Sequence, residues 1–172
     1  TSAAAPSVHR GLASQAVIAG EHRFLIDCGE GTQRQILRSG IGFKRLNRVL
    51  LTHAHLDHLL GLGGLVSTFV RWEDGIEELE IYGGKPALDR VYNLIFGVVL
   101  FNEEPPMPIH LIDIKPGIIL QSKDLTVTAF PVVHRGQGNF GFIFEEPTHH
   151  PFLAEKAEAL GVPAGPERGK LV

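Results

Sequence analysis

Short apolar runs alternate with amphipathic stretches along the first two thirds of the chain. The runs are rich in β-branched and aromatic residues and are bounded by turn formers, which predicts strands at residues 16–19, 23–28, 48–53, 79–83 and 109–114. Between them, the spacing of apolar positions predicts helices at residues 32–38, 61–72 and 86–100. This alternation indicates a mixed α/β fold.

The pattern changes in the last third of the chain. Residues 117–121, 124–134 and 140–146 are typical of consecutive strands joined by short polar turns, which predicts an antiparallel meander. Residues 147–172 hold one short helix, at 152–160, between clusters of proline and glycine that build no core. We therefore expect a domain over residues 1–146 and a projecting arm over residues 147–172.

The composition is that of an ordinary globular protein. The 172 residues, 44% of them hydrophobic, suffice for one domain with a sizeable core. No apolar run approaches the roughly 20 residues that a membrane span needs, so we expect no membrane association. The single cysteine, Cys28, cannot form an internal disulfide, which favours the cytoplasm as the compartment.

Charge is distributed unevenly, although the net charge is only -3. Residues 31–56 contain five basic side chains and no acidic one, whereas residues 73–80 contain five acidic side chains and no basic one. Two interpretations stay open: a local face that attracts phosphate groups, or two solvated surface segments.

Residues 50–65, LLTHAHLDHLLGLGGL, carry the most specific chemistry in the chain. Alternate side chains of a strand share a face, so His53 and His55 would point the same way and grip one ion. Asp57 and His58 would follow in the turn and at the start of the next helix. Imidazole and carboxylate ligands without thiolate are typical of catalytic Zn²⁺, and a pair of ions could clamp a phosphoryl or acyl centre. The alternative is a chance cluster of histidines, or histidines that cap a helix.

The motif THAHLDH resembles the HxHxDH signature of the metallo-β-lactamase fold. Its flanking stretches resemble the ribonuclease Z family, whose members trim the 3′ trailers of precursor tRNA. The likeness runs through TSAAAPSVHRGLASQAV, FLIDCGEGTQRQ, AFPVVHRGQGNFGFIFEE and AEALGVPAGPERGKL. It implies an αββα sandwich, incomplete in this chain, and a zinc-dependent endoribonuclease that leaves a tRNA 3′-hydroxyl.

The resemblance also implies roles for individual residues. One zinc ion would be held by three imidazoles, those of His53, His55 and His134. A second zinc would be held by Asp57 and His58, with Asp57 also accepting a proton from the attacking water. Asp27 would steer the ligand histidines, as outer carboxylates generally do. Without the resemblance, His134 would be an ordinary surface histidine and Asp27 an aspartate that ends a strand.

Substrate contacts are implied at both ends of the chain. Arg10 in PSVHRG is the candidate for a phosphate or base contact near the acceptor end of tRNA, although Gly11 stands where the family usually has asparagine. The arm would clamp the body of tRNA through its Gly-Pro-rich turn, at Gly161, Pro163, Gly165 and Pro166. Family members act as homodimers, in which one subunit's arm holds tRNA for the other's active site.

The family completes its site with a bridging aspartate and a further histidine, which would lie beyond Val172. We therefore expect this chain to be the N-terminal part of a longer enzyme. Two rival functions stay open: a phosphodiesterase of the same fold acting on small or cyclic diesters, and a catalytically silent module that binds tRNA or a protein.

Overall fold

The computed structural model describes residues 4–71, 76–101, 103–148, 152–166 and 168. Some sequence-based predictions fall outside these residues. They concern Trp72 at the end of a predicted helix, residues 73–75 of the acidic stretch, and residues 149–151, 167 and 169–172 of the predicted arm.

The first sheet contains the five strands predicted for the first two thirds of the chain. In spatial order they are β1 (Gln15–Ala19), β2 (His22–Ile26), β3 (Arg48–Leu50), β4 (Leu79–Gly83) and β5 (Ile109–Asp113). β1 pairs antiparallel with β2, and every later pair is parallel. The carboxyl ends of β2, β3, β4 and β5 therefore meet at one edge of the sheet.

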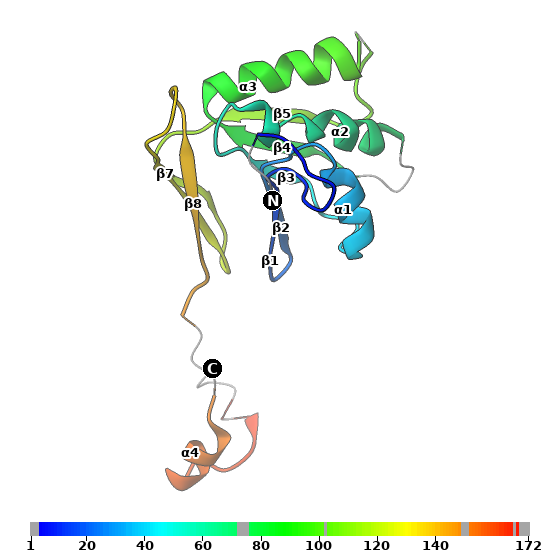
Figure 1. Cartoon of the computed structure of the whole chain (residues 1–172). Coiled ribbons are helices and arrows are strands. Elements are labelled where there is room, and N and C mark those ends of the chain that lie inside the picture. The colour runs from blue at the N-terminus through cyan, green and yellow to red at the C-terminus, as the bar shows by residue number, and fades with distance from the viewer. Residues whose placement is uncertain (1–3, 72–75, 102, 149–151, 167, 169–172) are drawn as a thin grey trace.

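Helices cover one face of this sheet (Figure 1). They are α1 (Thr32–Ser39), α2 (Gly61–Arg71), α3 (Lys85–Tyr92) and the π-helical segment η2 (Asn93–Val99), which continues from α3. Their apolar faces bury a core with the sheet that includes Leu25, Val49 and Ile81. Pro86 lies in the first turn of α3, where its missing N–H costs nothing. The predicted helix over residues 86–100 is thus confirmed, with a change of helix type after Tyr92.

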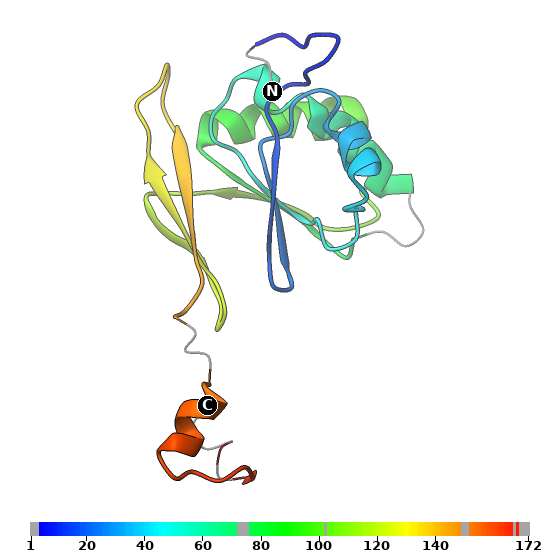
Figure 2. The same cartoon turned by 60° about the horizontal axis from the view of Figure 1, so that its bottom comes forward.

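The second sheet is the predicted meander, with β7 (Thr126–Pro131) between β6 (Gly117–Gln121) and β8 (Phe140–Glu145). All its pairs are antiparallel. Its inner face packs on the first sheet through a second core that includes Phe24, Leu50 and Val127. The described helices, sheet and second sheet thus form three layers, α-β-β, and no described helix covers the outer face of the second sheet (Figures 1 and 2).

Three predicted strands end two or three residues earlier than expected, and all three ends shape the candidate site. β7 ends at Pro131, so His134, predicted at the end of that strand, lies in the loop that follows. β3 ends at Leu50 because the Thr52 amide donates to the Asp27 carboxylate at 2.8 Å, where a strand would bond to a neighbouring strand. β2 ends at Ile26 because Asp27 adopts a left-handed backbone with φ 57°. The prediction that His53 and His55 lie on a strand was therefore wrong, since both follow the strand in an extended connection.

The short helix predicted in residues 152–160 is present as α4 (Ala154–Ala159). Gly161, with φ 79°, ends it in the left-handed conformation that favours glycine. Arg168 donates to the Val162 carbonyl at 2.8 Å and closes the following turn. α4 lies apart from both sheets in the two views (Figures 1 and 2). No helix in the described residues is long and apolar enough to span a membrane.

Candidate metal centre

Three histidine side chains converge beyond the carboxyl end of β3. Nitrogen atoms of His53, His55 and His134 all lie within 4.8 Å of one another. His53 and His55 come from the connection after β3, whereas His134 comes from the loop between β7 and β8. The cluster therefore forms where the edges of the two sheets meet.

The donor set and its spacing fit a zinc ion. His134 Nε2 lies 3.4 Å from His55 Nδ1. Two nitrogens that bind one zinc tetrahedrally, each at ~2.0–2.1 Å, are also about 3.4 Å apart. Among the residues that the structure describes, these three histidines are the only group of three or more potential ligands. Asp57 and His58 lie next to them, with Asp57 Oδ2 3.6 Å from His58 Nε2, and form no such group themselves.

Asp27 is a hydrogen-bonding hub beneath the cluster. Its carboxylate is only 5% exposed and accepts from three donors. Oδ1 accepts the Thr52 amide at 2.8 Å, while Oδ2 accepts the Thr52 hydroxyl at 2.8 Å and His58 Nδ1 at 2.7 Å. These bonds tie the end of β2 to the connection after β3, so they determine where the motif sits.

The hydrogen bonds to Asp27 also determine which ring nitrogen is free in His53 and in His58, the two inner histidines of the site. Because the Asp27 carboxylate can only accept, His58 Nδ1 carries a proton, and in the neutral ring its Nε2 keeps the lone pair. The Thr52 hydroxyl donates to Asp27, so it must accept from His53 Nδ1, at 2.9 Å. His53 Nε2 is therefore also free. Thr52 was missed by the sequence analysis, although it stands directly before His53 in the motif.

The two inner histidines have pKa values shifted in opposite directions. Burial, together with the neighbouring His58 and His55, lowers the pKa of His53 to about 4. The hydrogen bond to Asp27 raises the pKa of His58 above its ordinary value, against the effect of burial. His53 is therefore neutral at pH 7, the state in which an imidazole can bind a metal ion.

Asp57 is held from the N-terminal segment. The Ala4 amide donates to Asp57 Oδ2 at 3.0 Å. Desolvation would raise the pKa of this carboxyl, but the Ala4 amide, its own amide and the nearby histidines together hold it below its ordinary value. The side chain is thus a carboxylate at neutral pH. It lies in the 3-10 turn η1 (Leu56–His58), in the turn before α2 where the sequence predicted it.

Close backbone packing fixes the motif from below. A Cβ added at Gly61 would lie 2.8 Å from the Cys28 carbonyl oxygen and closer still to that of Gly29. Gly61 N–H donates to the same Cys28 carbonyl at 2.8 Å, and Cys28 N–H to the His58 carbonyl at 2.7 Å. Burial raises the pKa of the Cys28 thiol to about 12, so this sulfur stays protonated and supplies no thiolate ligand.

The remaining candidate residues are not part of the histidine group. Arg10 is exposed in the segment that leads from Ala4 to β1. Gly161, Pro163, Gly165 and Pro166 lie in the turns after α4, which both views place apart from the sheets (Figures 1 and 2). The structure therefore brings together the motif, Asp27 and His134, and it leaves the predicted substrate contacts outside this group.

The beta-lactamase superfamily domain matches residues 22–154, well over half of the chain. The chain belongs to this superfamily. The αββα sandwich is the fold implied by the sequence resemblance, and the three layers described above agree with it as far as they extend.

Within the superfamily, the chain is similar to proteins named ribonuclease Z. That of Bradyrhizobium diazoefficiens is 44% identical over 171 residues, which cover 99% of this chain and 56% of the relative. That of Methanothermobacter thermautotrophicus is 36% identical, with 99% and 54% covered. The crystal structure of the short form of human tRNase Z matches with a TM-score of 0.72 at 27% identity, over 85% of this chain and 61% of that one. The resemblance seen in the sequence is confirmed, and the chain spans about half the length of the curated relatives it matches.

Proposed function

We propose that the protein containing this chain is a zinc-dependent endoribonuclease that removes 3′ trailers from precursor tRNA and leaves a tRNA 3′-hydroxyl. The observation that carries the proposal is the identity of 44% to a ribonuclease Z, which extends over 99% of the chain and includes the histidine cluster. A function assigned from fold alone would be weaker, because one fold hosts many activities.

In this proposal, one zinc ion is held by His53, His55 and His134. A second zinc ion is bound partly by Asp57 and His58, and the family resemblance implies that its remaining ligands lie beyond Val172. Zinc bound there would supply positive charge against the phosphodiester and lower the pKa of a water molecule. The support from this chain is the imidazole donor set, the 3.4 Å separation of His55 and His134, and the free Nε2 atoms of His53 and His58.

The side chains around the cluster would orient and move protons. Asp57 is the proposed proton acceptor, and its lowered pKa keeps it ionised and ready to accept at neutral pH. Asp27 would hold His58 directly and His53 through Thr52, so that the same tautomers are present in every turnover. Arg10 would contact the substrate from the N-terminal segment.

The arm, the assembly and the compartment are further parts of the proposal. The body of the tRNA would be held by the turns at Gly161, Pro163, Gly165 and Pro166. In a homodimer, the arm of one subunit would hold the tRNA whose 3′ end lies in the active site of the other. The separation of α4 from both sheets supports an arm that reaches outward (Figure 1). Cytoplasmic tRNA would be the substrate. Sedimentation of the purified protein would test the dimer.

The cleavage assay uses the complete gene product that contains this chain. A precursor tRNA with a 3′ trailer and the small diester bis(p-nitrophenyl) phosphate are offered separately, with and without a chelator. We expect cleavage at the 3′ end of the tRNA, abolished by the chelator, restored by zinc and absent in His53→Ala. Chelator-insensitive cleavage, or rapid turnover of the small diester without cleavage of the precursor, would contradict the proposal.

A further inference from the structure

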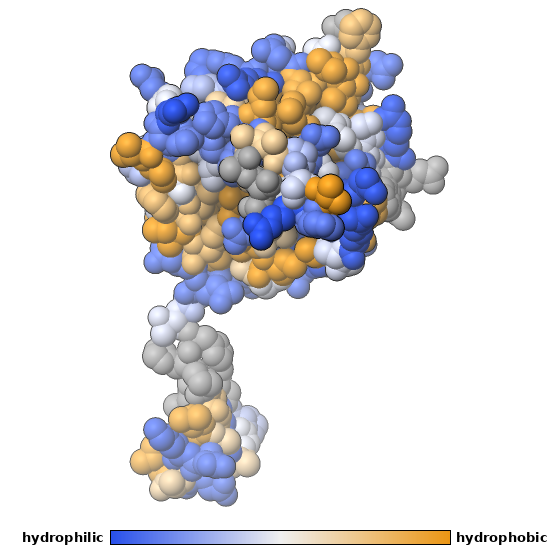
Figure 3. All heavy atoms as spheres, in the orientation of Figure 1, coloured by the Kyte–Doolittle hydropathy of each residue, from blue (hydrophilic) through white to orange (hydrophobic). Residues whose placement is uncertain are grey.

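A cavity of about 280 Å³ lies between the N-terminal segment and helix α1. Pro6–Gly11 form one wall, and the other runs from Glu30 to Arg38 along α1. Three arginines line it: Arg10, Arg34 and Arg38. One acidic residue, Glu30, lines it as well, so the lining carries two net positive charges with histidine neutral. Strongly hydrophilic atoms gather over α1 in the space-filling view (Figure 3).

The three guanidinium groups lack protein partners. Within the residues that the structure describes, none of them forms a hydrogen bond or an ion pair, whereas Arg45 pairs with Glu21 and Arg48 with Glu80. The arginines of the basic stretch therefore divide: Arg45 and Arg48, outside the cavity, are paired, whereas Arg34 and Arg38, in its wall, are not. Unpaired arginines that converge on one cavity can bind an anion with planar, bidentate geometry.

Of the two arginines on α1, Arg34 is placed against the stability of the helix, whereas Arg38, in the last turn, is favourably placed at the negative end of the helix dipole. Arg34 and Arg38 are four residues apart on one face, so their like charges repel. Arg34 also lies in the first turn, at the positive end of the helix dipole, and that turn contains no acidic residue. A bound anion between the two side chains would relieve both unfavourable interactions.

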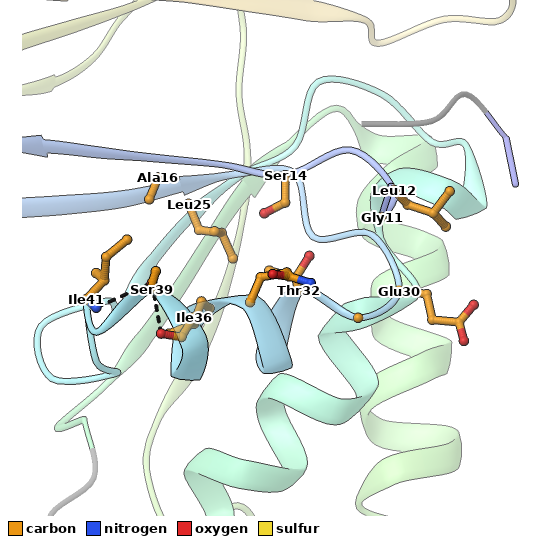
Figure 4. Close-up of a pocket in the computed structure, with 12 residues that line it drawn as sticks. Gly11, Leu12, Ser14, Ala16, Leu25, Glu30, Thr32, Ile36, Ser39 and Ile41 are labelled. Atoms are coloured by element: carbon orange, nitrogen blue, oxygen red, sulfur yellow. Dashed lines mark hydrogen bonds between the residues drawn. The ribbon is translucent and has the colours of Figure 1, made fainter. Parts of the chain in front are cut away.

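A neighbouring cavity provides a contrast. It has a volume of about 260 Å³, lies between α1 and the first two strands, and is lined mainly by apolar atoms (Figure 4). The hydroxyl groups of Ser14, Thr32 and Ser39 in its wall each donate to a backbone carbonyl. These hydroxyl groups therefore already have hydrogen-bond partners within the protein, in contrast to the arginines of the basic cavity.

The basic cavity lies beside the candidate metal centre along both of its walls. The N-terminal segment is hydrogen-bonded to Asp57 through the amide of Ala4. Ala4 lies six residues before Arg10, so the backbones of these two residues are at most about 20 Å apart. On the other wall, Gly31 of the cavity lies two residues from Gly29, which packs directly against the Asp57 backbone. Since a duplex strand rises about 3.4 Å per phosphate, this upper limit corresponds to at most roughly six phosphates.

We propose that Arg34 and Arg38, together with Arg10, form a phosphate-binding subsite that holds the RNA backbone a few nucleotides from the scissile bond. The identity of the ligand as RNA rests on the proposed function. The subsite lies on the core of the protein and is separate from the proposed arm, so it would position the strand near the cut while the arm holds the body of the tRNA.

The test compares two double variants that each remove two positive charges. Arg34→Gln with Arg38→Gln empties the cavity of its helix-borne charges. Lys44→Gln with Lys123→Gln is the matched control, because both lysines are exposed and neither lines the cavity. Binding of a precursor tRNA is measured in chelator, where no cleavage occurs, at salt concentrations from 0.05 to about 0.5 M, chosen to expose counterion release.

We expect the arginine variant to bind roughly tenfold more weakly at 0.1 M salt, with the slope of log K against log salt reduced by about 1.4–1.8, as the loss of two phosphate contacts requires. The control should change neither quantity to this extent. Thermal unfolding should show the arginine variant folded and about as stable as wild type, since the repulsion removed within α1 offsets the lost interaction of Arg38 with the helix dipole. Equal affinities and equal slopes in the two variants would overturn the subsite.

This experiment separates the subsite from the proposed function. Failure of the wild-type protein to cleave any precursor would overturn the endoribonuclease, while the binding measurement would still report on the arginines. If cleavage is normal and the arginine variant binds RNA like wild type, the subsite alone is wrong. If the arginine variant instead loses binding of a protein partner while binding RNA normally, the cavity is a protein-docking site and the RNA proposal is again wrong.

Discussion

The histidine cluster has an inner and an outer half, and the two are held in different ways. His53 and His58, the inner pair, are tied to Asp27 directly or through Thr52. His55 and His134, the outer pair, contact each other at 3.4 Å, and within the described residues their ring nitrogens form no other hydrogen bond. The inner pair is thus oriented by the protein itself, whereas in the proposed metal centre a bound ion would fix the outer pair. Changes on the inner side should therefore affect folding and metal binding together, and changes on the outer side metal binding alone.

The largest effect is expected from Asp27→Ala. The substitution leaves the Thr52 amide, the Thr52 hydroxyl and His58 Nδ1 without their acceptor in a largely buried place, which should cost about 3–4 kcal/mol of unfolding free energy. Urea unfolding monitored by circular dichroism measures the loss. A loss below about 1 kcal/mol would show that the inner pair is not held by this carboxylate. Asp27→Asn, which keeps the shape and loses the charge, should retain more stability and still weaken zinc binding 10–100-fold.

Gly61→Ala should have the next largest effect, because the new methyl group would overlap the backbone carbonyl of Gly29 beneath the inner pair. We expect a loss of about 2–3 kcal/mol, as for an overpacked site. Gly63→Ala in the same helix is the matched control, since its nearest neighbour would be 3.6 Å away. That substitution should leave stability unchanged or raise it by up to about 1 kcal/mol. Similar losses in both variants would show that helix propensity, and not close packing, governs the segment.

Thr52→Val tests the link between Asp27 and His53. The variant keeps the size of the side chain and removes the hydroxyl that bridges the two residues, for an expected loss of about 1–2 kcal/mol. Zinc affinity, measured by competition with a chromogenic chelator, should fall because His53 can then rotate or change tautomer. Thr52→Ser keeps the hydroxyl and should restore affinity. If the valine variant binds zinc like wild type, the hydroxyl does not orient His53.

The smallest effect on stability is expected from His134→Ala. This side chain is exposed, so the unfolding free energy should change by no more than about 0.5 kcal/mol. Zinc affinity should nevertheless fall, because one of three nitrogens is removed from the cluster. A substantial loss of stability in metal-free buffer would show that the outer pair has a structural role and would remove the distinction between the two halves.

The sequence allowed much of this arrangement to be predicted because the relevant signals are local. The alternation of apolar and polar residues and the turn residues indicated eight strands, five alternating with helices and three in a meander. The four ionisable residues within HAHLDH indicated a metal centre. His134 lies 76 residues from the motif's last histidine, and only the family resemblance placed it in the same group.

Other features could not be predicted because they depend on contacts between distant segments. β3 stops at Leu50 because its next free amide bonds to Asp27, 25 residues earlier, and no property of residues 48–53 alone reveals this. Thr52 acquires its role from the same contact. The sequence also does not reveal how the basic stretch is arranged. Arg48 is paired with Glu80 across the sheet, whereas Arg34 and Arg38 line one cavity with Arg10 only in the folded chain.

The most direct test of the proposed metal centre is zinc content at equilibrium. The complete gene product and its His55→Ala/His134→Ala double variant are dialysed against the same buffered zinc concentration, and bound zinc per chain is measured by atomic emission. We predict that the wild-type protein retains zinc and that the double variant loses at least the ion held by these histidines while remaining folded. Equal zinc in the two proteins would contradict the assignment of His53, His55 and His134 as a metal centre.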